Sequence, residues 1–202
     1  KKSLCLIDAK GFLDSSSKNK VAKGFFNDAY LFDQNACTAP KIIVWRGCSN
    51  HIQTAKKEFW SRVYKIALSN YALTSKMAID KLFNLYNNLI KSDTFIDFKQ
   101  HGNLIYRTEV SRQDIKYSDL NLHFGHFLEL EGDLSDLREI CSSKLQTLSY
   151  FGMEKEELFE FILESKIKGI DRIVPIGKTM DFSLIWDGYD MINMLSREIT
   201  II

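Results

Sequence analysis

Short apolar runs that alternate with longer amphipathic stretches constrain the fold of this 202-residue chain more than any other feature. The first such unit covers residues 2–45, where the apolar runs at 3–7 and 41–45 are typical of buried strands. Between the two runs, apolar side chains recur at the spacing of one helix face, namely at Val21, Phe25, Ala29 and Phe32. The unit therefore predicts a strand, a helix, a connecting loop and a second strand.

The last third of the chain repeats this order. Residues 145–151 indicate a strand, residues 154–166 a helix with Leu158, Phe161 and Ile162 inward, and residues 172–176 another strand. A helical crossover makes the two strands parallel. We therefore expect an α/β fold with a mostly parallel sheet flanked by helices. The length and the ordinary apolar fraction predict one domain over residues 1–202.

The middle of the chain is expected to be scaffold. Helices are predicted over 49–70 and 75–91, a polar loop over 91–101, strands over 104–108 and 120–130, and a short helix over 134–141. A helical piece is expected around 186–195, followed by a β-branched tail strand at 199–202 that needs a partner edge. In the second long helix, buried packing is favoured over a cofactor site for the apolar residues Ile79, Leu82, Phe83, Tyr86 and Ile90.

Charge and cysteine usage narrow the functional class. The net charge is +1, and basic residues are interspersed with acidic ones, so neither a nucleic-acid footprint nor a basic membrane-binding patch is visible. No apolar run reaches the roughly 18 residues that suggest a membrane span, and early charges argue against a signal peptide. With four widely spaced cysteines, these features predict a cytoplasmic protein with free thiols. No cysteine and histidine spacing predicts a metal site.

Cys37 is the candidate nucleophile. It lies in Asp33-Gln34-Asn35-Ala36-Cys37-Thr38-Ala39-Pro40, between the aromatic-rich helix and the following strand. The flanking residues are polar, Pro40 stops any helix, and backbone N–H groups at such a turn can point at one spot. A buried structural cysteine is the alternative. Lys41, the nearest cation, indicates either a solvated side chain or an activating charge.

Two blocks of sequence resemble one known family. Asp171-Arg172-Ile173-Val174-Pro175-Ile176-Gly177, with the segment from Asp181 to Asp190, is similar to the carboxyl end of LuxC-type long-chain acyl-CoA reductases. The stretch Phe32-Asp33-Gln34-x-x-Cys37-x-x-Pro40 resembles the nucleophile loop of that family. The family in turn resembles the aldehyde dehydrogenases, and the likeness is to the carboxyl-terminal catalytic half.

The resemblance implies a reaction and assigns residues to it. Cys37 would accept the acyl group of a fatty acyl-CoA or acyl-protein thioester, and NADPH would then reduce this acyl-cysteine to the fatty aldehyde. Phe124 would contact the nicotinamide ribose of the cofactor, although Leu122 stands where the resemblance predicts a glutamate. The residue pattern alone instead makes Phe124 a strand core residue. Trp186 either lines the substrate cavity near Cys37, or packs as core beside a turn.

In that turn, Gly188 would take a positive φ and Asp187 would cap the following helix.

The resemblance also implies binding partners and an upstream domain that binds the cofactor. Because the sequence contains no glycine-rich phosphate motif, we expect NADPH to be bound mainly by an upstream domain, and the isolated chain to be inactive in reduction. A homo-oligomer is implied through the terminal strand, as is an acyl-protein synthetase partner. Two other hypotheses stay open: a non-catalytic assembly module that docks the synthetase, and an acyltransferase without a redox step.

Overall fold

A seven-stranded sheet forms the centre of the computed structural model, which describes residues 1–91, 94–111 and 120–201. The strand order is β3-β4-β5-β2-β1-β6-β7, with a separate pair β8-β9. In chain order the elements are β1 (Lys2–Asp8), α1 (Ala9–Asp14), α2 (Lys18–Tyr30), β2 (Pro40–Arg46), α3 (Ser49–Asn70), α4 (Ser75–Lys91), β3 (Phe95–His101), β4 (Ile105–Val110), β5 (His126–Glu131), η2 (Leu134–Asp136), α5 (Leu137–Ile140), β6 (Leu145–Phe151), α6 (Lys155–Ser165), β7 (Arg172–Pro175), β8 (Ile185–Trp186), β9 (Tyr189–Asp190) and α7 (Met191–Leu195).

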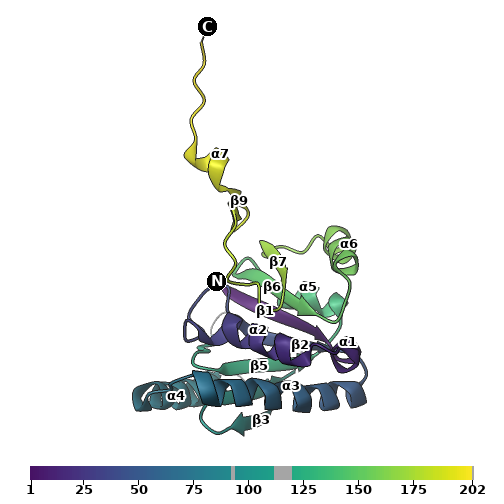
Figure 1. Cartoon of the computed structure of the whole chain (residues 1–202), viewed down its shortest axis with the longest axis vertical. Helices are drawn as coiled ribbons and strands as arrows, with labels where there is room; N and C mark the ends of the chain where they lie inside the picture. Colours follow the sequence, from purple (N-terminus) through teal and green to yellow (C-terminus); the bar gives the residue numbers. More distant parts are fainter. Residues whose placement is uncertain (92–93, 112–119, 202) are drawn as a thin grey trace.

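The predicted α/β class is confirmed. Every pair in the sheet is parallel except β3 with β4, which is antiparallel. The crossovers through α2 and α6 place β2 beside β1 and β7 beside β6, as the two predicted units require. Figure 1 shows α2 and α3 lying across one face of this sheet.

Helices cover both faces, because adjacent residues of a strand point to opposite sides. Trp45 packs with Phe25 and Phe59 in the core cluster of α1, α2 and α3. Its neighbour Val44 belongs to the second cluster, with Leu137 of α5 and leucines of β5 and α6. The centre of the sheet is thus buried on both sides, which explains why β1 and β2 are continuous apolar runs rather than alternating ones.

Strand β3 corrects the predicted loop over residues 91–101. Phe95–His101 pairs antiparallel with β4 at the edge of the sheet, through a turn in which Gly102 has a φ of 50°. All five central residues of β3 are exposed, so neither face selects apolar side chains and no alternation marks the strand in the sequence.

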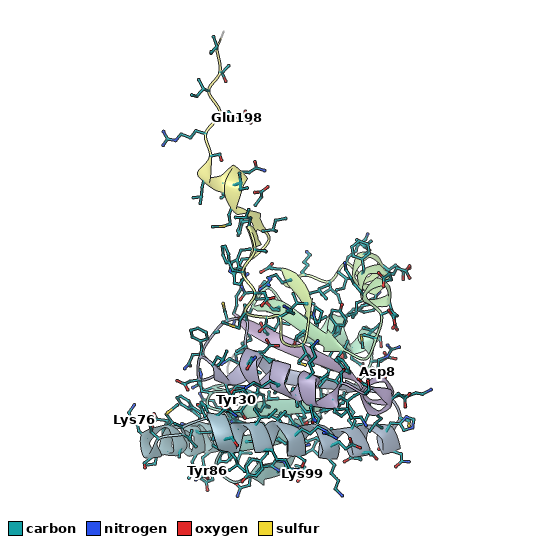
Figure 2. All side chains as sticks on the ribbon, in the orientation of Figure 1. Asp8, Tyr30, Lys76, Tyr86, Lys99 and Glu198 are labelled. Carbon is teal, nitrogen blue, oxygen red and sulfur yellow. The ribbon has the colours of Figure 1, made fainter. Side chains whose placement is uncertain are left out.

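Helix α4 corrects a second prediction, because its apolar stripe faces outward. Ile79 is 67% exposed and Ile90 is 82% exposed, whereas the buried residues of the helix are Lys81, Leu85 and Asn88. Tyr86 lies on the outer margin of the molecule in Figure 2. Hydrogen bonds turn the polar face inward: Lys81 donates to backbone carbonyls, and the Asn88 amide pairs with the backbone of Asn121.

The carboxyl-terminal residues leave the body of the protein (Figure 1). After β7 the chain forms the short β8-β9 pair and α7, whose first turn is capped by the Asp190 carboxylate. The predicted tail strand is wrong for the residues that the structure describes, since 196–201 have no regular secondary structure. Within residues 1–91, 94–111 and 120–201, no helix is long and apolar enough to span a membrane.

Candidate active site at the cysteine loop

Cys37 lies in the connection between α2 and β2, residues 31–39, which we call the cysteine loop. Its thiol is exposed, so a substrate can reach it. Asp33 and Gln34 both adopt left-handed backbone conformations, with φ of 53° and 61°, and this pair of residues bends the chain away from the helix axis. A hydrogen bond of 3.0 Å from Ala39 N to Ala36 O then closes a turn around Cys37.

The backbone of Cys37 is fixed to the sheet by a buried serine. Ser3 of β1 donates its hydroxyl to the Cys37 carbonyl at 2.7 Å and accepts a hydrogen bond of 3.2 Å from Thr147 N of β6. Because Ser3 is fully buried, this bridge is shielded from water. Two central strands therefore hold the peptide that carries Cys37.

Gln34 is a site residue whose role was not predicted. Its side chain is fully buried and spans the gap between the cysteine loop and residues 122–126, which we call the Phe124 segment. Nε2 donates to Pro40 O at 3.1 Å and to His126 O at 3.0 Å. Oε1 accepts from Gly125 N at 3.1 Å and from His126 N at 3.2 Å. Gln34 belongs to the sequence motif around Cys37, but no local sequence pattern predicts hydrogen bonds to residues about ninety positions away.

Asp33 makes the second link between these segments. Its carbonyl accepts a hydrogen bond of 3.2 Å from Phe124 N, and its carboxylate accepts one of 2.8 Å from the Tyr71 hydroxyl. Tyr71 follows α3 directly, so the end of that helix also supports the loop. Burial and the neighbouring Asp33 carboxylate raise the pKa of Tyr71, which keeps the hydroxyl a donor.

The Phe124 segment differs from the prediction of a strand over 120–130. The strand begins only at His126, and Phe124 and Gly125 both have positive φ, at 57° and 82°. Phe124 is half-buried and is not a strand core residue. Lys81 of α4 donates to its carbonyl at 2.9 Å, so a third element fixes this segment. Phe124 therefore lies beside the cysteine loop with part of its ring accessible.

The C-terminal block, residues 171–190, contacts the other side of the cysteine loop. Thr38 donates its hydroxyl to the Met180 sulfur at 3.2 Å. Asp28 of α2 accepts from Gly177 N at 2.6 Å and from Thr179 N at 3.2 Å. Burial raises the pKa of Asp28 to about 6, against which these N–H groups favour the carboxylate. Both stretches that resemble the family thus meet around Cys37.

Trp186 belongs to the edge of this block. Its ring lies 4.3 Å from the Arg172 guanidinium and 5.2 Å from the Phe182 ring, and it is half-buried rather than enclosed by core. The expected turn is present, with Gly188 at a φ of 81°. However, Asp187 does not cap the next helix: it accepts from Gln146, and Asp190 is the cap. The expectation of Trp186 as core and Asp187 as cap is therefore wrong.

The other cysteines and Lys41 differ in how far they are buried. Burial raises the pKa of Cys5 and of Cys141 to about 12, whereas Cys48 is exposed like Cys37. Lys41 is not solvated: it is buried, it donates to the Leu122 carbonyl, and burial lowers its pKa to about 8. Its Nζ lies 3.5 Å from Nδ1 of His123, so the cation supports the Phe124 segment.

The side chains around the cysteine loop bear on whether the site could hold a metal ion or a cofactor. Among the described residues, no group of three His, Cys, Asp or Glu side chains could hold a metal ion. For a nicotinamide cofactor, the half-buried ring of Phe124 and the exposed thiol of Cys37 lie on segments that two residues link directly. An accessible aromatic ring beside an exposed thiol is an arrangement that fits the nicotinamide end of such a cofactor.

Comparisons with known proteins identify a family and a shared fold. The sequence matches the family described as "Acyl-CoA reductase (LuxC)" over residues 1–198. No curated protein matches the sequence significantly. Solved aldehyde dehydrogenases share the fold.

A 1-pyrroline-5-carboxylate dehydrogenase from Thermus with bound NAD superposes with a TM-score of 0.57 at 12% identity, covering 93% of this chain and 37% of that one. An NAD-dependent aldehyde dehydrogenase from Sinorhizobium meliloti gives 0.56 at 9% identity, covering 90% and 38%. A salicylaldehyde dehydrogenase from Pseudomonas putida G7, complexed with salicylaldehyde, gives 0.55 at 13%, covering 92% and 40%. The chain thus spans about two fifths of the length of these structures.

Proposed function

The chain belongs to the LuxC family of acyl-CoA reductases, and on that premise we propose that it takes part in the NADPH-dependent reduction of long-chain fatty acyl thioesters to aldehydes. The observation that carries the proposal is the exposed Cys37 thiol on a loop that Gln34 and Asp33 join to the Phe124 segment. Acyl-CoA and acyl-protein thioesters present the same reacting group, and either could donate the acyl chain.

The first half-reaction is acyl transfer to Cys37. Its thiolate attacks the carbonyl carbon of the thioester, a new carbon–sulfur bond forms, and the thiolate of coenzyme A leaves. A thiolate leaving group makes a strong base unnecessary for this step. The contribution of the protein is positioning, because the Ser3 hydroxyl and the Gln34 amide hold the loop in one conformation.

The second half-reaction regenerates the thiol. NADPH, when bound, supplies the hydride that reduces the acyl carbon. Phe124 would contact the nicotinamide ribose of the bound cofactor, while Lys81 and Asp33 fix the backbone of Phe124. When the carbon–sulfur bond breaks, the electron pair returns to Cys37 as thiolate and the aldehyde leaves.

Acyl labelling tests the proposal directly. Wild-type protein incubated with radioactive long-chain acyl-CoA should carry label on Cys37, and Cys37→Ser should carry none while keeping its fold, because serine has nearly the same shape but no thiolate chemistry. Cys48→Ser is the matched control, since Cys48 is also exposed. Undiminished label on Cys37→Ser, or loss of label from Cys48→Ser, would contradict the proposal.

A second candidate function is an assembly module, for which the outward face of α4 is the supporting observation. Apolar side chains there are exposed, Phe83 and Tyr86 among them, and Tyr86 lies on the outer margin of the molecule in Figure 2. A second, separate set of exposed apolar side chains, including Phe182 and Tyr189, lies on residues 182–201, which leave the body of the protein (Figure 1). Exposed apolar side chains that gather on one helix face are typical of protein interfaces. We propose that the chain forms homo-oligomers through these surfaces and that an acyl-protein synthetase is a further partner.

Light scattering distinguishes this assembly from a monomer. Phe83→Glu and Tyr86→Glu together should shift the mass toward that of one chain, because two carboxylates in an apolar interface would lose their hydration. Ser69→Glu on the exposed end of α3 is the matched control. An unchanged mass in the double variant would exclude α4 from the interface.

A further inference from the structure

The Gln34 side chain has a buried position that packing alone does not explain. A glutamine amide has two N–H donors and an oxygen with two lone pairs, and here each capacity is used on the backbone. The donors face Pro40 O and His126 O, and the oxygen faces Gly125 N and His126 N. One amide therefore joins the strand that follows Cys37 to the segment that carries Phe124.

These four contacts need the amide group specifically. A methionine of similar shape would remove all four bonds, so that the Gly125 N–H would lose its Gln34 partner and the His126 N–H would keep only its bond to His123 O. A glutamate could accept from the two N–H groups but would face the two carbonyls with negative charge. The backbone of Gln34 also has a φ of 61°, which an L-residue adopts at a cost. Without its side-chain bonds, the loop is free to relax from this conformation.

We propose that Gln34 is a positioning residue, which sets the placement of Cys37 relative to the Phe124 segment and through it the rates of acyl and hydride transfer. The proposal rests on the function proposed for Cys37 and deepens it. Because Gln34 bonds to backbone on both sides and not to substrate, its removal should lower the rate constant of acyl transfer and leave the half-saturating concentration of acyl-CoA unchanged.

The experiment uses the 202-residue chain and three variants. Gln34→Met removes the amide, Gln34→Glu keeps its shape and its acceptors, and Gln53→Met is the control, since Gln53 is an exposed glutamine that donates to Glu131. Single-turnover acylation by long-chain acyl-CoA is followed by mass spectrometry. Hydrogen exchange is measured at the Gly125 and His126 amides. Alkylation by iodoacetamide is measured at Cys37 relative to Cys48.

Gln34→Met should be acylated about 10- to 100-fold more slowly than wild type, since small displacements of reacting groups cost factors of this size. Exchange at Gly125 and His126 should accelerate while exchange in β2 stays unchanged. Gln53→Met should match wild type in every measurement. A wild-type acylation rate in Gln34→Met, or unchanged exchange at the two amides, would overturn the proposal.

The pH dependence separates positioning from a general loss of structure. In Gln34→Glu, a protonated carboxyl group regains one donor, so the acylation rate relative to wild type should rise as the pH falls from about 8 to about 6, because burial raises the pKa of a carboxyl group. This comparison lies within one folded protein, so it holds even if Gln34→Met does not fold. A ratio independent of pH would count against Gln34 as a donor to the loop.

Failure of the proposed function has a different signature. If wild-type Cys37 takes no label from acyl-CoA, the acylation chemistry is wrong, and the exchange and alkylation measurements decide the positioning role alone. Faster exchange at Gly125 and His126, with a changed ratio of alkylation at Cys37 to that at Cys48, would keep Gln34 as the residue that positions the thiol. If both measurements equal those of wild type, the positioning role is refuted as well.

Discussion

Replacement of Lys81 by methionine should change how the free energy of unfolding depends on pH. Lys81 is 1% exposed, and its ammonium group donates to the carbonyls of Asn103 and Phe124 and lies 4.3 Å from the ring of Tyr106. These partners are neutral acceptors and a ring face, so none of the described contacts brings a full negative charge that would offset the burial of the cation. Burial therefore lowers the pKa of Lys81 from 10.5 to about 7.

The magnitude follows from that pKa difference. Each pH unit is worth about 1.36 kcal/mol, so the buried cation costs the native state about 5 kcal/mol at low pH. Between pH 7 and pH 10.5 the unfolded chain binds the proton and the native protein does not, so stability rises with pH in this window. Integrated from pH 7 to pH 9, the contribution of Lys81 is about 2 kcal/mol, and Lys81→Met removes it.

At one pH the net effect of the variant is the difference between two opposing changes. Methionine removes the cost of burying the charge, but it leaves the Asn103 and Phe124 carbonyls without their donor, at about 1–3 kcal/mol each. The pH dependence avoids this ambiguity, because neither methionine nor an unpaired carbonyl titrates. Other groups that titrate in the window, such as the buried Lys41, cancel in the comparison with wild type.

Urea unfolding at pH 7 and pH 9 measures the effect. From pH 7 to pH 9, the free energy of unfolding of wild type should rise by about 2 kcal/mol more than that of Lys81→Met. Lys76→Met, at an exposed lysine of the same helix, should track wild type. If Lys81→Met and wild type show equal pH dependence, the buried-cation reasoning is refuted.

Three further predictions follow from burial and contacts. Iodoacetamide at neutral pH should modify Cys37 much faster than Cys5 or Cys141, whose pKa values burial raises to about 12, and peptide mapping would show equal rates if this is wrong. Burial raises the pKa of Asp28 from 3.8 to about 6 in the folded protein, so the free energy of unfolding of wild type should fall by about 2 kcal/mol relative to that of Asp28→Asn between pH 4 and pH 7. Denaturant unfolding that shows the same pH dependence for both proteins would contradict this. Trp186→Phe should lower the melting temperature slightly by weakening the contact with the neighbouring guanidinium, worth about 0.5–1 kcal/mol, and leave acylation unchanged; slower acylation at unaltered stability would instead place Trp186 in the substrate site.

The amino-acid sequence by itself predicts those features that depend on residues close together in the chain. The apolar runs at 3–7 and 41–45 predict buried parallel strands because a strand covered on both faces excludes polar side chains at every position. The sequence also predicts the loop around Cys37, because polar residues and Pro40 end the helix before the next strand.

Tertiary structure decided everything that joins distant residues. Gln34 pairs with backbone groups more than ninety residues away, and Lys81 turns the polar side of α4 toward the Phe124 segment although the apolar stripe predicts the opposite. Edge strand β3 had no pattern to predict it, because neither of its faces is buried. The spacing of apolar residues indicates which side of a helix or strand is buried against other apolar residues. A buried amide or ammonium group is instead placed by individual hydrogen bonds. The geometry of those bonds exists only once the chain has folded.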